Sequence, residues 1–150
     1  MTGSEGRRRL TTDSPWEAEF GYCRALRVAD RILVAGCGCV EDGRVTHPAD
    51  PMAQARVALR IGLDAVAELG GRPEDVVRTR MYLTHRRDCE DVGRVHGEVF
   101  GATPPVSTMI VVAGLVHPDM CVEIEMEVVV APEGAAPAQH DDPASDDATT

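Results

Sequence analysis

The chain has 150 residues and a formal net charge of −10, and its 15 basic residues are all arginine. The absence of lysine excludes a lysine Schiff-base mechanism and the usual P-loop lysine, and the acidic balance argues against nonspecific nucleic-acid binding. No apolar run approaches the roughly 18 residues that span a bilayer, and no apolar segment follows the N-terminal arginines, so we expect neither a membrane span nor a secretory signal.

The two ends of the chain differ in composition from its middle. Residues 1–14 are polar and predict a flexible N-terminus. Residues 132–150 are rich in Pro, Ala and Asp, without apolar periodicity, and predict a disordered acidic tail. We therefore expect one folded domain over residues 15–131.

The domain is predicted to alternate strands and helices. Apolar stretches with a period of two favour strands, and a stripe with helical spacing favours a helix. The predicted elements are, in chain order, strands over 20–28 and 31–36, a helix over 51–69, a strand over 75–84, a helix over 88–100, and strands over 106–114 and 121–131. This order, β-β-α-β-α-β-β, predicts a two-layer α+β domain with both helices on one face of the sheet.

Local signals support these boundaries. Residues 29–30 predict the turn of the first hairpin, and Asp42-Gly43 predicts a second turn. Asp50 is a good N-cap, followed by Pro51 at the first helical position, and Gly70-Gly71 predicts the end of that helix.

The last strand carries a column of acids. Alternation places Glu123, Glu125 and Glu127 on the face opposite its apolar residues. Arg78 and Arg80 share a face of the third strand, so we expect cross-strand ion pairs if these strands are neighbours. Tyr82 and Val129 also lie on this face, which is poorly suited to open water. We therefore expect it to pack against other subunits.

The order of elements resembles the Rid family of enamine/imine deaminases, also called YjgF-like or L-PSP endoribonuclease-like proteins. The stretches that carry the resemblance are ADRILVAG, DPMAQARVALRIGLDAVAELGG, EDVVRTRMYLTHRRDCEDVGRVHGEVFG, PPVSTMIVVAGL and VEIEMEVV. The resemblance implies a chorismate-mutase-like protomer, and a homotrimer whose sheets form a central barrel with the helices outside. It also implies pockets between adjacent subunits that bind a small-molecule substrate without a cofactor.

The resemblance assigns a first set of site residues. Glu123 matches a glutamate that handles a proton or a water near the substrate nitrogen, while Glu125 and Glu127 match no catalytic position and are interpreted as ion-pair partners. Tyr22 matches a pocket tyrosine in the first strand, although it could equally be a core aromatic. The segment that closes the second strand contributes backbone amides and is made of Ala35, Gly36 and Cys37. Cys37 itself is interpreted as a small apolar residue in preference to a nucleophile.

The chain departs from the deaminase pattern at two positions. Val106, in Pro-Pro-Val-Ser, stands where an arginine binds the substrate carboxylate, and an isopropyl group cannot replace a bidentate guanidinium. Gly93 stands where deaminases often carry asparagine. Both changes predict a less polar pocket, which Ser107 and Thr108 also line. His96 is either a replacement polar group or a helix-packing histidine.

These observations favour an enzyme that acts on a small imine, enamine or carbonyl intermediate by hydrolysis, tautomerisation, dehydration or cyclisation. The alternatives are a 2-aminoacrylate deaminase, which Val106 argues against, and a non-catalytic binding or chaperone-like trimer. Five cysteines without CxxC spacing predict reduced thiols in the cytoplasm. Cys37-Gly-Cys39 has no second ligand pair and the histidines form no HExxH motif, so we expect no metal site.

Overall fold

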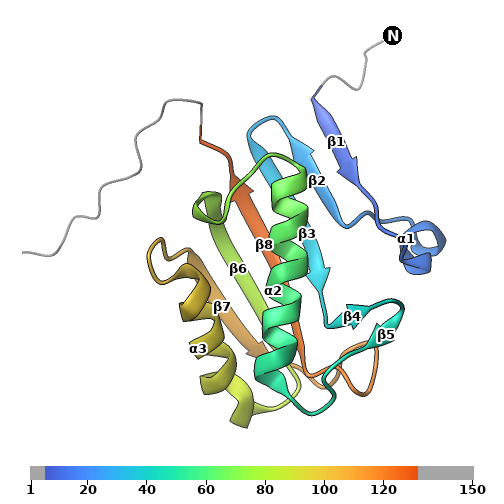
Figure 1. Cartoon of the computed structure of the whole chain (residues 1–150), viewed down its shortest axis with the longest axis vertical. Coiled ribbons are helices and arrows are strands. Elements are labelled where there is room, and N and C mark those ends of the chain that lie inside the picture. The colour runs from blue at the N-terminus through green and yellow to red at the C-terminus, as the bar shows by residue number, and fades with distance from the viewer. Residues whose placement is uncertain (1–5, 132–150) are drawn as a thin grey trace, which may run out of the picture.

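The computed structural model describes residues 6–131 (Figure 1). The predicted disordered tail, residues 132–150, lies outside this range. The elements are, in chain order, β1 (Arg7–Leu10), α1 (Pro15–Phe20), β2 (Ala25–Val28), β3 (Arg31–Cys37), β4 (Val40–Glu41), β5 (Arg44–Val45), α2 (Pro51–Glu68), β6 (Val76–Leu83), α3 (Cys89–Phe100), β7 (Val106–Val111) and β8 (Val122–Val129).

Six strands form one sheet in the order β1-β2-β3-β8-β6-β7. Neighbouring strands are antiparallel except β6 and β7, which run parallel and are connected through α3. Helices α2 and α3 lie side by side across one face of this sheet (Figure 1). The two-layer α+β architecture predicted from the sequence is confirmed. Neither α2 nor any other helix within residues 6–131 is long and apolar enough to span a bilayer.

The predicted helix and turn signals form as expected. Asp50 Oδ1 accepts a hydrogen bond from the backbone N–H of Ala53 at 2.9 Å, and Pro51 occupies the first turn of α2. Asp42 and Gly43 both have positive φ between the paired strands β4 and β5, which is the backbone that a tight hairpin needs.

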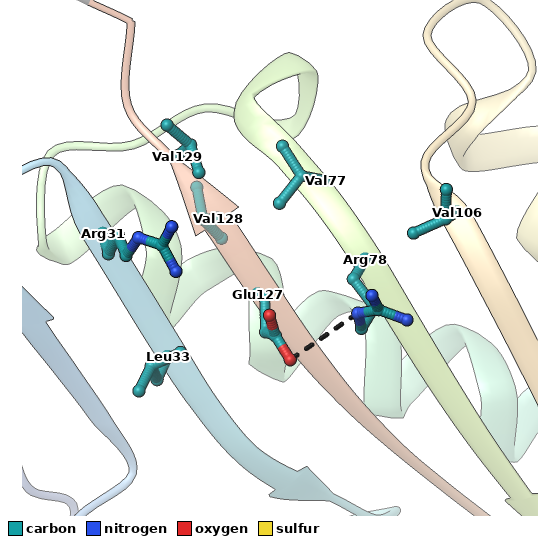
Figure 2. A pocket seen from close by; sticks show the side chains of 8 residues that line it. All are labelled: Arg31, Leu33, Val77, Arg78, Val106, Glu127, Val128 and Val129. Atoms are coloured by element: carbon teal, nitrogen blue, oxygen red, sulfur yellow. Dashed lines mark ion pairs between the residues drawn. The ribbon is translucent and has the colours of Figure 1, made fainter.

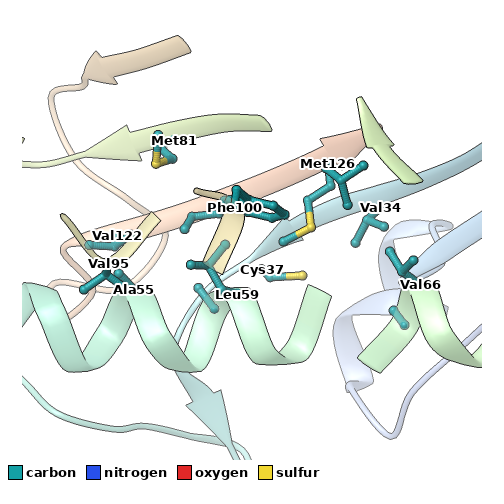
Figure 3. Packing of buried hydrophobic residues seen from close by; sticks show 14 of the residues in the cluster. Val34, Cys37, Ala55, Leu59, Val66, Met81, Val95, Phe100, Val122 and Met126 are labelled. Atoms are coloured by element: carbon teal, nitrogen blue, oxygen red, sulfur yellow. The ribbon is translucent and has the colours of Figure 1, made fainter. Parts of the chain in front are cut away.

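The core lies between the sheet and the two helices (Figure 3). The four apolar residues of β8 that face it are almost completely buried, with exposed fractions of 0–2%, and they are Val122, Ile124, Met126 and Val128. Burying one such side chain contributes about 1.5–3 kcal/mol. Gly62 of α2 allows close packing, because a Cβ atom there would lie 2.7 Å from Cε of Met126.

The N-terminal region contains more structure than the sequence predicts. β1 pairs with β2 within the segment 1–14 that was expected to be flexible. Backbone hydrogen bonds to an edge strand are available to any residue type, so a run of arginines gave no strand signal. The expected strand from residue 20 is also wrong, because α1 ends in a left-handed residue, Gly21, and β2 begins only at Ala25.

Strand β6 contains an irregularity that interrupts the alternation of its side chains. The register with β8 shifts between Val76 and Arg78, so Val76 is buried and Val77 is 42% exposed. Regular alternation would place Val77 on the same face as the buried Thr79 and Met81, and the shift directs it to the other face. A bulge of this kind changes the face of every residue before it.

Candidate functional site

Glu123 lies near the start of β8 on the face that no helix covers. Its neighbours in the strand, Val122 and Ile124, are fully buried on the helix side, so alternation directs Glu123 to the other side. A Cβ atom on Gly36 would collide with Glu123 Oε1. The carboxylate therefore rests directly on the backbone of β3, in a space that any larger residue at position 36 would fill.

The environment of Glu123 raises its pKa above the ordinary value. Burial is the main cause, the positive charge of Arg24 acts in the opposite direction, and the negative charge of Glu125 adds to the rise. A carboxyl group with a raised pKa is better matched to proton transfer near neutral pH than an exposed one.

Arg24 is a nearly buried cation that the sequence analysis did not identify. Its side chain is 13% exposed, and Nη1 donates to the carbonyl of Gly36 at 2.7 Å. Nη2 lies 3.5 Å from Oε1 of the buried Glu17, which also accepts two hydrogen bonds of 2.8 Å from Thr12. A buried guanidinium needs such partners, but they come from β3 and α1 and are not visible in the local sequence.

Cys37 is fully buried beside this cation. Its thiol donates to the carbonyl of Ala35 at 3.3 Å and lies 3.7 Å from Nη1 of Arg24. Burial raises the pKa of the Cys37 thiol, although the charge of Arg24 opposes the rise. The thiol therefore stays protonated near neutral pH, which agrees with a packing role and argues against a nucleophile.

A cavity of about 450 Å³ adjoins Glu123 on the open face. Its walls include Tyr82 and Glu125 together with the segment from Val112 to Val116, where the Val116 side chain is 94% exposed. Tyr82 is the register partner of Glu123 across β6 and β8, and burial is the main cause that raises its pKa. Tyr82 thus joins the candidate site as a phenol donor that the sequence analysis placed only on this face.

Tyr22 does not occupy the position expected for it. It lies in the turn between α1 and β2, outside any strand, and its side chain is 41% exposed. The shift follows from α1, which takes up the residues expected to begin the first strand. Ala35 and Gly36, by contrast, lie at the expected end of β3, next to Glu123.

Val106 lies at the opposite end of the sheet from Glu123. It begins β7 beside Arg78 of β6, whereas Tyr82, the partner of Glu123, pairs with Ile110 further along β7. The protomer alone therefore does not bring Val106 and Glu123 together. The residue next to Val106 is a cation, whereas the sequence analysis expected a less polar environment. Ser107 and Thr108 follow Val106 in β7.

Gly93 and His96 belong to the helix side of the sheet. His96 Nε2 lies 2.8 Å from the hydroxyl of the buried Thr79, which is hydrogen bonded to Ser107 at 2.9 Å. Burial lowers the pKa of His96, so the ring is neutral at pH 7. A Cβ atom on Gly93 would approach Met109 at 3.7 Å, an ordinary packing distance. Both residues pack α3 against β6 and β7, away from Glu123.

The predicted ion pairs across the open face form as a ladder. Arg80 Nη1 lies 2.7 Å from Glu125 and 3.1 Å from Glu127, and Arg78 Nε lies 3.7 Å from Glu127. Within residues 6–131, no group of three or more His, Cys, Asp and Glu side chains is placed to hold a metal ion. The open face thus combines acids and arginines, with Glu123 the one acid of the column that makes no direct ion pair among the described residues.

Comparison with known proteins identifies the family. The family model described as Endoribonuclease L-PSP matches residues 11–130. The uncharacterised protein SCO2049 of Streptomyces coelicolor is 40% identical over 124 residues, which cover 83% of this chain and 92% of that protein.

Solved structures agree with this assignment. Rv2704 of Mycobacterium tuberculosis, a member of the YjgF/YER057c/UK114 family, is 37% identical with a TM-score of 0.75, covering 83% of this chain and 99% of that one. E. coli TdcF with bound serine shares the fold at 22% identity and a TM-score of 0.69, covering 83% and 94%. The chain belongs to the Endoribonuclease L-PSP family, which includes the YjgF and Rid proteins.

Proposed function

We propose that the protein is an enzyme that acts on a small imine, enamine or carbonyl intermediate, with Glu123 as its general acid and base. The observation that carries this proposal is the Glu123 carboxyl itself. It is partly buried on the backbone of Gly36, opposite Tyr82 and at the edge of a cavity, with a pKa raised by burial. TdcF, which shares the fold, has been solved with a small amino acid bound.

Hydrolysis of an imine illustrates the proposed chemistry. The Glu123 carboxylate takes a proton from a water molecule as the water oxygen bonds to the imine carbon. The protonated carboxyl then gives that proton to the nitrogen, which completes a carbinolamine. The carboxylate next takes the proton of the carbinolamine hydroxyl and passes it to the same nitrogen, so that the carbonyl forms, the carbon–nitrogen bond breaks and the amine leaves. Backbone N–H groups near Gly36, and near Thr108 of a neighbouring copy, would hold the developing oxyanion. Tautomerisation requires only that the carboxyl group deliver a proton to one atom of the substrate and remove a proton from another, without water.

The proposal includes a homotrimer. The open face carries exposed apolar side chains, among them Leu33 at 47%, Val106 at 60% and Ile110 at 43%. Covering this face with other copies would remove these side chains from water. It would also place the Val106 end of one protomer beside the Glu123 end of the next, completing a cleft that a single chain leaves divided.

The test compares two carboxylates of the same column. The wild type, Glu123→Gln and Glu125→Gln are incubated with 2-aminoacrylate generated enzymatically and with a cyclic imine, and release of the carbonyl product is followed. We expect acceleration by the wild type, a loss of about 10²–10⁴-fold in Glu123→Gln, and a much smaller loss in Glu125→Gln.

Each remaining outcome has a definite meaning. Acceleration that survives in Glu123→Gln would reject Glu123 as the acid and base. Faster hydrolysis of 2-aminoacrylate, without faster hydrolysis of the cyclic imine, would favour the deaminase over the other reactions. Saturable binding of these compounds without any acceleration would favour a non-catalytic binding protein.

A further inference from the structure

We propose that the connection between β7 and β8 forms a specificity wall of the Glu123 site, where Val116 contacts an apolar substituent of the substrate. The buried Gln54 is the positioning residue of this wall. The inference rests on the proposed function and adds a substrate preference to it. The connection, called here the β7–β8 segment, comprises residues 112–121. Part of it lines the cavity of about 450 Å³ beside Glu123.

The two ends of the β7–β8 segment are held by adjacent residues of the chain. The backbone N–H of Val112 donates to the carbonyl of Leu83, the last residue of β6, at 2.8 Å. The backbone N–H of Thr84, the next residue, donates to the carbonyl of Cys121 at 3.2 Å. A surface loop whose ends lie this close together is a compact unit of a kind that frequently carries function.

Gln54 fixes the second half of the segment from the helix side of the sheet. Its side chain on α2 is completely buried, and Nε2 donates to the carbonyls of Asp119 at 2.7 Å and His47 at 3.1 Å. Oε1 accepts from the backbone N–H of Cys121 at 2.8 Å, two residues before Glu123. A buried amide whose donors and acceptor are all engaged specifies a single arrangement of the segments that it joins.

Two neighbouring residues of the segment differ sharply in their surroundings. Leu115 packs against a small hydrophobic cluster of Cys39, Val57 and Met120, which anchors the middle of the segment. Val116, the next residue, is 94% exposed. Its isopropyl group is thus presented to water from a fixed backbone, and covering it with another apolar group is favourable.

The cavity beside Glu123 has a polar and an apolar side. The sheet contributes Tyr82, Glu123 and Glu125, and the β7–β8 segment contributes Val112, Gly114, Leu115 and Val116. A substrate whose imine or carbonyl group reacts at Glu123 would therefore place its substituent against the segment. Contact with Val116 removes apolar surface of both groups from water, which favours a short alkyl substituent over a polar one.

The second cavity of the open face does not offer the same recognition. Figure 2 shows this cavity of about 240 Å³ around Glu127, towards the other end of β8, with Leu33 and Val106 among its walls. The proposed trimer covers these two side chains, whereas the cleft that it forms at Glu123 admits the substrate. The β7–β8 segment is therefore the apolar surface that a substrate at Glu123 reaches.

The experiment measures a ratio of rates for two substrates, because a variant that only loses folded protein slows both equally. A flavin-dependent amine oxidase generates the aldimines of propylamine and pentylamine, which differ by two methylene groups. Release of the aldehydes in the presence of the full chain is followed. We expect the wild type to prefer the pentyl aldimine in kcat/KM by at least about tenfold. Both accelerations should be lost in Glu123→Gln.

Three variants test the residues of the wall. Val116→Asn replaces the isopropyl group with a polar amide, and the preference should fall to within about twofold of unity. Val40→Asn makes the same exchange on β4, at a side chain that is 44% exposed and outside the cavity, and should keep the wild-type ratio. Gln54→Met keeps the length of the side chain but removes its hydrogen bonds, so it should lower the ratio by about threefold or more and speed hydrogen exchange at the Cys121 amide.

The outcomes separate this inference from the proposed function. A wild type that accelerates neither aldimine would overturn both. Acceleration that depends on Glu123 but shows no preference, or a preference that Val116→Asn retains or Val40→Asn equally loses, would overturn the inference alone. A lower mass of Val116→Asn in light scattering would do the same, because Val116 would then be a contact between copies. A wild-type ratio in Gln54→Met would reject Gln54 as the positioning residue.

Discussion

The two faces of β8 differ in composition and in burial. The helix side carries four apolar residues with exposed fractions of 0–2%, and the open side carries Glu123, Glu125 and Glu127 among exposed apolar neighbours. The first face is complete within one chain. On the second face Glu125 and Glu127 are paired with arginines but the apolar groups are uncovered, which is the pattern of a surface that another molecule is expected to cover.

This contrast separates what stabilises the fold from what serves the function. The helix side of β8 carries only apolar side chains that pack in the core. The open side instead carries carboxyl groups whose ionisation depends on their surroundings. Of the three acids, Glu123 is the one held against the backbone without a direct ion pair in residues 6–131. Its position at the end of the ladder of ion pairs therefore distinguishes it chemically from Glu125 and Glu127.

The largest effect on stability is expected on the closed face. Ile124→Ala removes a fully buried side chain and should lower the free energy of unfolding by about 2–5 kcal/mol. Leu33→Ala, on the open face, removes a side chain that is 47% exposed in the single chain and should cost less than half as much once the copies have dissociated. Urea unfolding of both variants, at protein concentrations at which the chain is dissociated, measures the difference, and equal losses there would show that the two faces are equally buried.

A smaller effect is expected at the buried cation beside Glu123. Glu17→Gln weakens the ion pair of Arg24 and should cost about 1–3 kcal/mol, because Arg24 is only 13% exposed. The matched control is Glu98→Gln, which breaks the pair of Glu98 with Arg56, where both side chains are 50% exposed, and should cost below about 1 kcal/mol. If the two variants unfold at the same urea concentration, Arg24 does not depend on Glu17.

The smallest effect is the pH dependence contributed by Glu123. Burial raises the pKa of this carboxyl above 4.5, so in the window between the two values the folded chain holds a proton that the unfolded chain has released. Stability therefore falls as pH rises through this window, and the full cost is present above the folded pKa. Glu123→Gln removes this cost.

Thermal unfolding across pH checks this sign. Glu123→Gln should be more stable than the wild type at pH 7, and the gain should vanish below pH 4.5. Glu125→Gln, which loses a 2.7 Å ion pair with Arg80, should show no such gain. A Glu123→Gln variant that is less stable at pH 7 would mean that Arg24 outweighs burial.

Much of the fold follows from local sequence signals. The helix at 51–68 and the strands that build the core have strong periodicity and clear caps, and their positions agree with the prediction to within a few residues. The errors occur where a tertiary contact decides whether a segment forms a strand or which way a side chain points. β1 is a strand because β2 offers a free edge, and Val77 turns outward because of a bulge that alternation alone cannot reveal.

The candidate site was less predictable. The resemblance identified Glu123, but Arg24 and Tyr82 are distant from it in sequence and approach it only through the pairing of β3, β8 and β6. The substitution at Val106 was visible in the sequence. The position of Arg78 beside it was not visible, because that requires the parallel register of β6 and β7.

The mass of the full chain in solution tests the central claim most directly, because the proposed cleft exists only if copies cover the open face. Light scattering should give three times the 16.1 kDa of one chain, and Leu33→Asp, which adds a charge to that face, should reduce it. Arg86→Asp, outside the face, should leave it unchanged. A wild type with the mass of a single chain would contradict the account.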